Sequence, residues 1–401
     1  MKKTILLSMI SWLALVPAAQ AQADDVVKVF NLDGMTPLAT LLDEAGKDAD
    51  SVVVSGPMSS DDMSALRSYC ANGQVRGVDI RKVTFANDSL PAKAFGWTGI
   101  DNPVESISLP EHLRVIGPYA LYYMGNLKHI EFPATLERIC YSAFNSCLSL
   151  RDVTLPEGLQ EIQSRVFSNA GMEELTIPAS VIEMGSEVCA NCLNLKSLTI
   201  LADVEVLRSN FAFQCEKLES LTLPSNIKAI GSSAFMSTAL SANVLPSSIE
   251  TIGENAFAYC KLEDVVLPDH VTSIGENAFK ANEMLKTAKL PASLKNIDQT
   301  AFTNCSHLNS VYSESPVPPT AIGKGTAPQA VLYVPEGSAE AYQAATWWKD
   351  FKEIKSYVPT AISTIAADAP GRKSAYTIGG VMAQQHYRGV VIKGGKKVIT
   401  K

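Results

Sequence analysis

The sequence lacks the features that identify most enzymes and nucleic-acid-binding proteins. It has only five histidines, all scattered, and it contains no zinc-binding H-E-x-x-H, nucleophile elbow, phosphate loop or dinucleotide-binding glycine pattern. The formal net charge is −7, and no basic stripe is present that would suit a nucleic acid. We therefore predict a protein that is not an enzyme, with no cofactor, no metal site and no nucleic-acid partner.

Long hydrophobic runs are also scarce. The one clear run, residues 5–16, follows Lys2 and Lys3 and is too short to span a bilayer. Ala19-Gln20-Ala21 then supplies the small-x-small pattern of a signal-peptidase site. We predict a cleaved signal peptide over residues 1–21, no transmembrane helix, and export to the cell surface, the exterior or the periplasm. No cysteine lies near the cut, which argues against a lipoprotein anchor.

A repeat of 22–23 residues fills the middle of the chain, over residues 107–313. Its marker is a proline that follows an apolar residue, and one interval of 46 has Leu201 where a proline would fall, which gives nine units. The prolines are Pro110, Pro133, Pro156, Pro178, Pro224, Pro246, Pro268 and Pro291.

Apolar residues recur at fixed offsets from each proline position. Leu, Ile or Val stands three residues after it, and Ile, Leu or Met six after it. Eleven after it stand Phe144, Phe167, Phe235, Phe257, Phe279 and Phe302. One unit cannot bury these side chains alone, but stacked units share a continuous core, which predicts a solenoid.

The segment before each proline alternates apolar and polar residues, which predicts one short strand per repeat in a parallel sheet. A glycine seven residues after the proline, as in Gly117, Gly185, Gly231, Gly253 and Gly275, should turn the chain where a side chain would interfere. Cys140, Gln163, Arg208 and Asp298 replace it elsewhere, and "SNFAFQC" moves the aromatic to Phe211 and Phe213. We expect local distortion in those units.

The combined pattern L-P-x-x-[LIV]-x-x-I-G-x-x-A-F-x-x-C-x-x-L-x-x-[VL]-x-L-P resembles the leucine-rich repeats of BspA-like bacterial surface proteins, also called the Treponema pallidum type. The resemblance implies an α+β leucine-rich repeat solenoid with a parallel sheet, and a source among Bacteroidetes-type bacteria. It also implies a role as a surface adhesin for host extracellular-matrix or bacterial macromolecules.

The ends of the repeats need caps, because terminal rungs would expose core and strand edges. Residues 22–106 are predicted as the first cap: a helix in "MTPLATLLDEAG", a strand in "DSVVVSG", a helix capped by Ser60, a strand in "VRGVDIRKVTF", and a degenerate first repeat with Ala94-Phe95. Residues 314–357 are predicted as the second cap, a strand and a helix with Ser338 at its N-cap. Tyr342, Trp347, Trp348 and Phe351 would form its lid.

Residues 358–401 are predicted to be a linker and a small β tail. Two interpretations stay open for the tail, which weakly resembles the sorting tails of Bacteroidetes secreted proteins: a sorting signal, or a structural hairpin.

Five of the eight cysteines lie fourteen residues after the proline position, where they are predicted to be buried, free thiols of the core: Cys147, Cys192, Cys215, Cys260 and Cys305. Cys192 and Cys215, in adjacent units, could also reach disulfide distance. Cys189-x-x-Cys192 has no partner motif for zinc, and Cys189 falls in the phenylalanine column, so we interpret the pair as core.

The outward side of the predicted strands is the remaining candidate site. Thr154, Thr176, Thr199 and Thr222 would form a ladder there, and Arg151, Lys289 and Tyr312 complete the predicted partner-binding residues. The ladder could equally reflect strand propensity at a solvated face. Tyr312 is the one aromatic expected on this face, which argues against a carbohydrate ligand, and Tyr119, Tyr122 and Tyr123 form a second contact patch.

These observations predict an exported, monomeric, non-enzymatic protein that binds a protein or other extracellular-matrix macromolecule, as a cell-surface adhesin would. The alternative is a structural spacer of the envelope with no soluble ligand. A remote alternative is an enzyme whose site has no recognised pattern.

Overall fold

The computed structural model describes residues 25–96, 102–242 and 245–358, together with the backbone of three strands near the C-terminus. The predicted signal peptide, residues 97–101 of the degenerate first repeat and most of the predicted linker lie outside the described residues. The chain divides into two compact units. Unit 1 comprises Met1–Asn226 and Ala234–Ala239, and unit 2 comprises Ile227–Ser233 and Leu240–Lys401.

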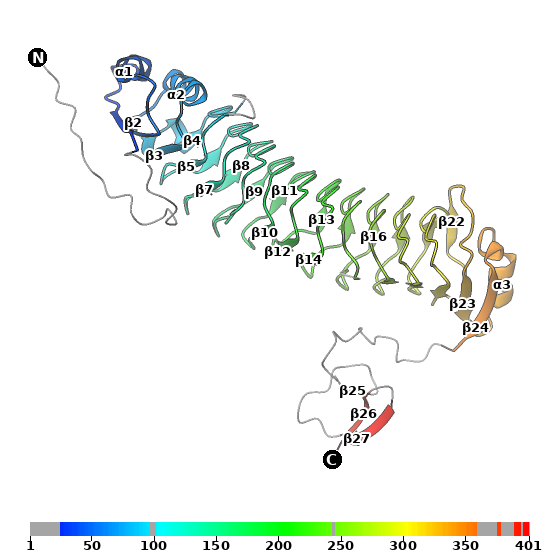
Figure 1. Cartoon of the computed structure of the whole chain (residues 1–401). Coiled ribbons are helices and arrows are strands. Elements are labelled where there is room, and N and C mark those ends of the chain that lie inside the picture. Colours follow the sequence, from blue (N-terminus) through cyan, green and yellow to red (C-terminus); the bar gives the residue numbers. More distant parts are fainter. Residues whose placement is uncertain are drawn as a thin grey trace, which may run out of the picture. The chain divides into compact units, whose positions relative to one another are not determined.

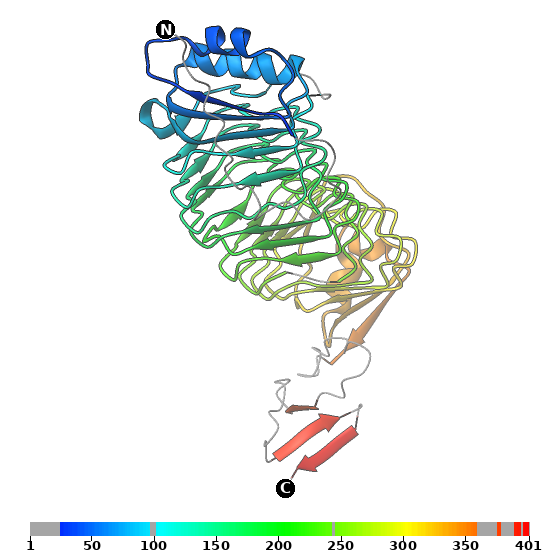
Figure 2. The same cartoon turned by 60° about the vertical axis from the view of Figure 1, so that its left-hand side comes forward.

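Unit 1 begins with strands β1 (Val27–Asn31), β2 (Ser51–Pro57) and β3 (Gly77–Thr84), which pair in parallel. Helices α1 (Leu38–Ala45) and α2 (Ser60–Asn72) connect them and lie together at the blue end of the ribbon (Figure 1, Figure 2). Both helices and the strands β2 and β3 confirm the elements predicted there. The N-cap of α2 is Ser59 and not Ser60, because Ser59 Oγ accepts the Asp62 N–H at 3.1 Å in a capping box.

The repeats of unit 1 contribute two sets of parallel strands. One set continues the first sheet through β5 (Ser106–Ser108) and β7 (His129–Glu131), and resumes as β10 (Glu174–Ile177), β12 (Ser197–Ile200) and β14 (Ser220–Thr222). Between them, an isolated bridge joins His129 to Asp152. The other set was not predicted from sequence and lies at the isoleucine column: β4 (Ser89–Leu90), β6 (Val115–Ile116), β8 (Arg138–Ile139), β9 (Glu161–Ile162) and β11 (Glu183–Met184), with the further short strand β13 (Val206–Leu207).

Unit 2 repeats this design. One parallel sheet holds β17 (Asp264–Val266), β19 (Thr287–Leu290), β21 (Ser310–Ser313), β23 (Val331–Pro335) and β24 (Glu353–Tyr357). The shorter strands are β15 (Ala229–Ile230), β16 (Thr251–Ile252), β18 (Ser273–Ile274), β20 (Asn296–Asp298) and β22 (Thr320–Ile322). Near the C-terminus, β25 (Ala375–Thr377), β26 (Gly389–Lys393) and β27 (Lys396–Thr400) form an antiparallel sheet.

The helix after β23 is shorter than the sequence pattern indicates. Helix α3 spans Ala339–Ala344, and Ser338 occupies its N-cap position without a side-chain capping hydrogen bond. Trp348 therefore lies in a separate 3₁₀ turn, Trp348–Asp350. The four predicted lid aromatics are nevertheless buried, and two are anchored: Tyr342 donates its hydroxyl to Ser315 O at 2.9 Å, and Trp348 Nε1 donates to Pro319 O at 2.8 Å.

The phenylalanine column forms the core of both units, as predicted. In unit 1 the Phe144 and Phe167 rings stack with centroids 5.5 Å apart. In unit 2 Phe279 stacks between Phe257 and Phe302, at 5.8 and 5.4 Å. All of these side chains are at most 4% exposed. Phe211 is buried as well, which confirms the shifted aromatic of that repeat, whereas Phe213 is half-buried.

The repeats turn at residues that the sequence analysis did not identify. Backbone φ is positive at non-glycine residues nine and thirteen positions after the proline in nearly every repeat, for example at Asn255 (53°) and Tyr259 (58°). Each donates its N–H to the next repeat, Asn255 to Glu276 O at 2.8 Å and Tyr259 to Lys280 O at 2.7 Å. These hydrogen bonds offset part of the cost of the left-handed conformation.

The repeat glycines do not have a positive φ, so they do not turn the chain in the way that was predicted. They do lie so close to the backbone of the preceding repeat that a side chain would interfere, which was also predicted. A Cβ on Gly253 would lie 2.8 Å from Ile230 O, and one on Gly275 would lie 2.8 Å from Glu254 N. Where another residue replaces the glycine, the outcome varies. Gln163 keeps the regular ladder by donating its N–H to Ile139 O, as Cys140 does to Ile116 O, so the distortion expected there is absent. At Arg208 the guanidinium Nε donates to Met184 O instead.

Candidate functional site

A row of threonines lies on the outward sheet face of unit 1. Thr176 pairs directly with Thr199, and Thr199 with Thr222, so that the three side chains follow one another at the spacing of parallel strands. Thr154 lies in the rung where only the bridge at Asp152 forms, so three of the four predicted threonines make the row. Arg151 is exposed at the edge of this face, and its guanidinium donates to Gly171 O.

A mixed row of lysine and tyrosine lies on the outward sheet face of unit 2. The strand register places Lys289 beside Tyr312, Tyr312 beside Tyr333, and Tyr333 beside Lys355. The Tyr312 and Tyr333 rings stack at 4.6 Å with 10° between their planes, and Tyr357 meets Tyr312 edge-on at 5.6 Å. The expectation of a single aromatic on this face is wrong, because β23 and β24 extend the same sheet.

Sequence reasoning missed Tyr333 and Tyr357 because both lie in the segment that it assigned to the second cap. The signal was present: "VLYVP" alternates like a repeat strand, and its two buried residues, Leu332 and Val334, place Tyr333 on the outward side. This segment was predicted as the strand of the second cap, but the sheet of the repeats was not extended through it.

Ion pairs between successive repeats cover the start of the outward strands. Lys128 contacts Glu105 at 2.8 Å, Lys196 contacts Glu173 at 2.6 Å, and Lys286 contacts Glu263 at 3.0 Å. A hydrogen bond from Lys196 and its positive charge lower the pKa of Glu173, and the same pair raises the pKa of Lys196. Lys289 of the tyrosine row likewise contacts Glu314 at 2.7 Å. The charges on both faces are therefore largely matched in pairs.

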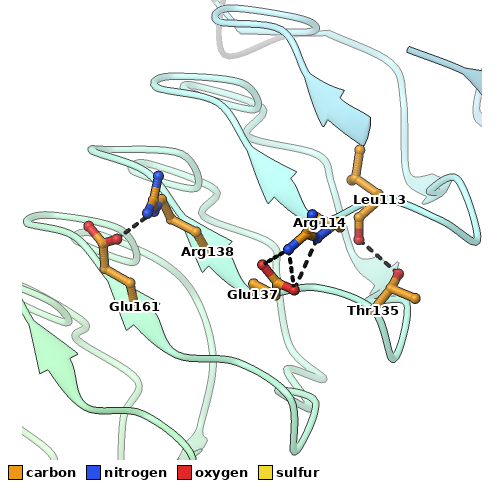
Figure 3. A network of polar contacts seen from close by, with 6 residues as sticks. All are labelled: Leu113, Arg114, Thr135, Glu137, Arg138 and Glu161. Carbon is orange, nitrogen blue, oxygen red and sulfur yellow. Dashed lines mark hydrogen bonds and ion pairs between the residues drawn. The ribbon is translucent and has the colours of Figure 1, made fainter. Parts of the chain in front are cut away.

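A second polar surface lies in unit 1, at the shorter strands (Figure 3). Arg114 holds Glu137 through two nitrogens, with Nε to Oε1 at 3.0 Å and Nη2 to Oε2 at 2.7 Å, and Arg138 pairs with Glu161 one repeat further on. Thr135 Oγ1 donates to Leu113 O at 2.9 Å. The Arg114–Glu137 pair borders an open hollow of about 500 Å³, which is also lined by Asp88, His112 and Thr135.

The tyrosines of the predicted second patch also come together in unit 1. Tyr119 meets Tyr122 edge-on at 5.5 Å, and Tyr122 meets Tyr123 at 4.6 Å. Tyr141, which the sequence analysis did not assign to the patch, meets Tyr119 edge-on at 5.3 Å from the next repeat. We refer to these four residues as the tyrosine cluster.

The cysteines are free thiols, and the five of the predicted column lie in the core, with Cys305 the least buried. Cys215 Sγ donates to Cys189 O at 3.0 Å and Cys192 Sγ to Phe167 O at 3.0 Å, so these thiols satisfy backbone carbonyls. Burial raises the pKa of Cys147 to about 12. Within the described ranges no group of three or more His, Cys, Asp or Glu side chains could hold a metal ion. In the same ranges no helix has the length and apolar character needed to cross a membrane.

The family model of the BspA type leucine rich repeat region matches residues 88–213 and 208–319 of this chain. A leucine-rich repeat protein of Bacteroides ovatus is 24% identical, with 70% of this chain and 69% of that chain covered and a TM-score of 0.55, so the two share a fold. A Treponema pallidum leucine rich repeat protein is 29% identical over 41% of this chain and 77% of its own, at a TM-score of 0.38. A leucine rich cell surface protein of Faecalibacterium prausnitzii is 19% identical over 73% of this chain and 91% of its own, at 0.37. No curated protein matches the chain.

Proposed function

Because the chain belongs to the BspA-type leucine-rich repeat family, we propose that it is an exported, non-enzymatic protein that binds a protein partner, as a cell-surface adhesin does. Export rests on the signal-peptide pattern of residues 1–21. The proposal keeps the predicted division of the chain, in which residues 22–106 and 314–357 cap the repeats.

The lysine and tyrosine row of unit 2 is the observation that carries the proposal. Tyrosine side chains in a packed cluster are typical of residues that dominate protein–protein binding energy, whereas lysine is typical of the surrounding polar surface. Tyr312 and Tyr333 hold each other in place by stacking, so little side-chain entropy is lost when a partner covers them. Lys289–Glu314 and Lys355–Glu353 supply a charged rim.

The threonine row of unit 1 offers a second contact surface of a different kind. Thr176 and Thr222 are exposed and Thr199 is half-buried, and each carries a hydroxyl that can donate or accept a hydrogen bond. Such a row suits the polar periphery of an interface more than its energetic centre, since threonine is under-represented among dominant binding residues.

The experiment is a binding assay with purified residues 22–401. Extracellular-matrix proteins and bacterial surface extracts are presented to the immobilised chain, and the retained protein is identified and its Kd measured. Tyr333→Ala should weaken binding about tenfold or more, as for a dominant interface residue. Tyr259→Ala, which removes an exposed tyrosine of unit 2 outside this row, is the matched control and should leave this Kd unchanged. If no protein is retained from any source, the structural-spacer alternative replaces the proposal.

A further inference from the structure

The aromatic rings of the tyrosine cluster in unit 1 lie at steep angles to one another. The ring planes of Tyr119 and Tyr122 are 88° apart, those of Tyr119 and Tyr141 are 76° apart, and those of Tyr122 and Tyr123 are 57° apart. Perpendicular or tilted rings each cover at most part of a neighbour's face, unlike the parallel pair in unit 2. Tyr123 is 40% exposed and the other three are half-buried, so the cluster presents both ring surface and phenol groups.

The other repeats show that the fold does not require these tyrosines. At the position of Tyr119 all later repeats carry a non-aromatic residue, and at the position of Tyr141 the repeats from Pro156 to Pro291 carry serine, glutamate or glutamine. The backbone is nevertheless the same, because the positive φ of Tyr119 and Tyr123 recurs at Ser142 and Ser146. Tyr119 and Tyr141 therefore stand at positions that polar residues fill in the later repeats, which marks a surface specialised for something other than the solenoid.

The electrostatics of the cluster indicate an uncharged ligand. Arg165 Nη1 donates to the Tyr141 hydroxyl at 3.3 Å, but the same guanidinium is bound by Glu187 through Nε and Nη2, each at 2.9 Å. Its charge is thus already matched.

We propose that the tyrosine cluster is a binding site for an uncharged saccharide. A pyranose ring with mainly equatorial hydroxyls has C–H faces that stack on the electron-rich face of an aromatic ring, and a rim of hydroxyls that hydrogen-bond phenols. Rings set at steep angles to one another suit such a ligand, because one ring takes the sugar face while the neighbouring phenols meet its rim. This site is separate from the protein-binding row proposed above and does not depend on it.

The test measures binding of neutral saccharides to the purified chain, residues 22–401. An array of neutral oligosaccharides, with sulfated and sialylated counterparts and a proline-rich peptide as further arms, selects the probe. Calorimetry then gives its Kd for each variant. Tyr123→Ala and Tyr122→Ala should each weaken binding about three- to tenfold. Tyr141→Phe keeps the ring and removes only the hydroxyl, so it should change the Kd less than Tyr123→Ala does.

Tyr259→Ala is the matched control, since Tyr259 occupies the position of Tyr123 in a repeat of unit 2 and is 46% exposed, but Asn255, Ala258 and Glu276 stand where the other three tyrosines of the cluster would be. It should leave saccharide binding unchanged, as should Tyr333→Ala. The proposal is overturned if no neutral saccharide binds, if sulfated or sialylated glycans or the peptide bind more tightly, or if Tyr259→Ala weakens binding as much as Tyr123→Ala. Loss of saccharide binding with protein binding intact, or the reverse, distinguishes the two sites.

Discussion

The phenylalanine column holds each repeat to the next, and its removal should be the most costly single change in a repeat. Phe257 is 2% exposed and stacks on Phe279, so Phe257→Ala should lower the free energy of unfolding by about 3–5 kcal/mol, as other large core truncations do. Glu254→Ala, at an exposed neighbour, should stay within about 0.5 kcal/mol. Urea unfolding followed by circular dichroism measures both, and equal losses would contradict the assignment of the column.

Single residues could be predicted where the repeat fixes their surroundings, and not elsewhere. The burial of Phe144 or Cys147 follows from an offset that recurs from unit to unit, so the sequence pattern alone placed them in the core. The positive φ at Asn255 has no such signal, since serine, arginine, glutamate and tyrosine take the same conformation in other repeats. There the residue donates its N–H to a carbonyl of the next repeat, as Asn255 does to Glu276 O, and a local pattern does not contain that contact.

The capping box of α2 is an element whose stability depends on pH. Burial would raise the pKa of Asp62, but hydrogen bonds from Ser59 Oγ and from the Leu38 and Ser59 N–H groups lower it below its usual 3.8. A lowered pKa means that the charged carboxylate stabilises the folded chain fully above about pH 4, the pKa in the unfolded chain, and that this contribution is lost as the pH falls further, through the lower pKa of the folded chain. Asp62→Asn should therefore cost about 1 kcal/mol at pH 7.

The same substitution should cost progressively less as the pH falls below about 4, where the wild-type carboxyl also becomes neutral. Chemical unfolding at a series of pH values compares the two proteins. Ser60→Ala is the matched control, because Ser60 is the first residue of the helix and its neighbour Ser59 provides the cap. A penalty for Asp62→Asn that does not change between pH 7 and pH 3 would argue against the charged cap.

The arginine–glutamate ladder of unit 1 is a second testable element. Arg114 and Glu137 meet through two nitrogens but remain exposed, so solvent and salt screen their attraction. A double-mutant cycle of Arg114→Ala and Glu137→Ala should give a small favourable coupling at low salt. It should disappear at about 1 M salt. A coupling free energy that persists at high salt would contradict the interpretation of Arg114 and Glu137 as a solvent-exposed ion pair.

Elements were predictable where one period governs a long segment. Helix α2 and strand β3 were predicted because the first cap switches from a helical to a strand-like sequence pattern. The two-residue strands at the isoleucine column were missed, because a strand such as Thr251–Ile252 is too short to show an alternation of apolar and polar residues. Helix α3 was predicted too long since Trp347 and Trp348 fit a helical face by spacing. In the structure the helix ends at Ala344 because Ala345 is extended, with a ψ of 130°, and Trp347 then has a φ of 70°.

At the scale of the whole chain, the two proposed sites are built in the same way. In each unit the repeat supplies a rigid backbone, and a few positions depart from the repeat's usual residues: tyrosines beside polar positions in unit 1, and tyrosines on the last strands in unit 2. The offsets of the repeat and the outward direction of Tyr333 could be read from the sequence, but the contact of Tyr333 with Tyr312, and that of Tyr141 with Tyr119, could not. Their proximity is set by how successive repeats stack on one another.

The rate at which the eight cysteine thiols react reports how readily the folded repeats open. Burial raises the pKa of Cys70 to about 12 and that of Cys305 to about 11, so at pH 8 both are neutral and poor nucleophiles. We expect a thiol-specific disulfide reagent to react slowly with the native protein, first at Cys305, the one cysteine that is only partly buried, and to modify all eight at once in urea. The absorbance of the released thiolate follows the reaction, and Cys305→Ser should remove its earliest phase. Fast modification of several thiols without denaturant would mean that the repeats open far more readily than a shared core allows.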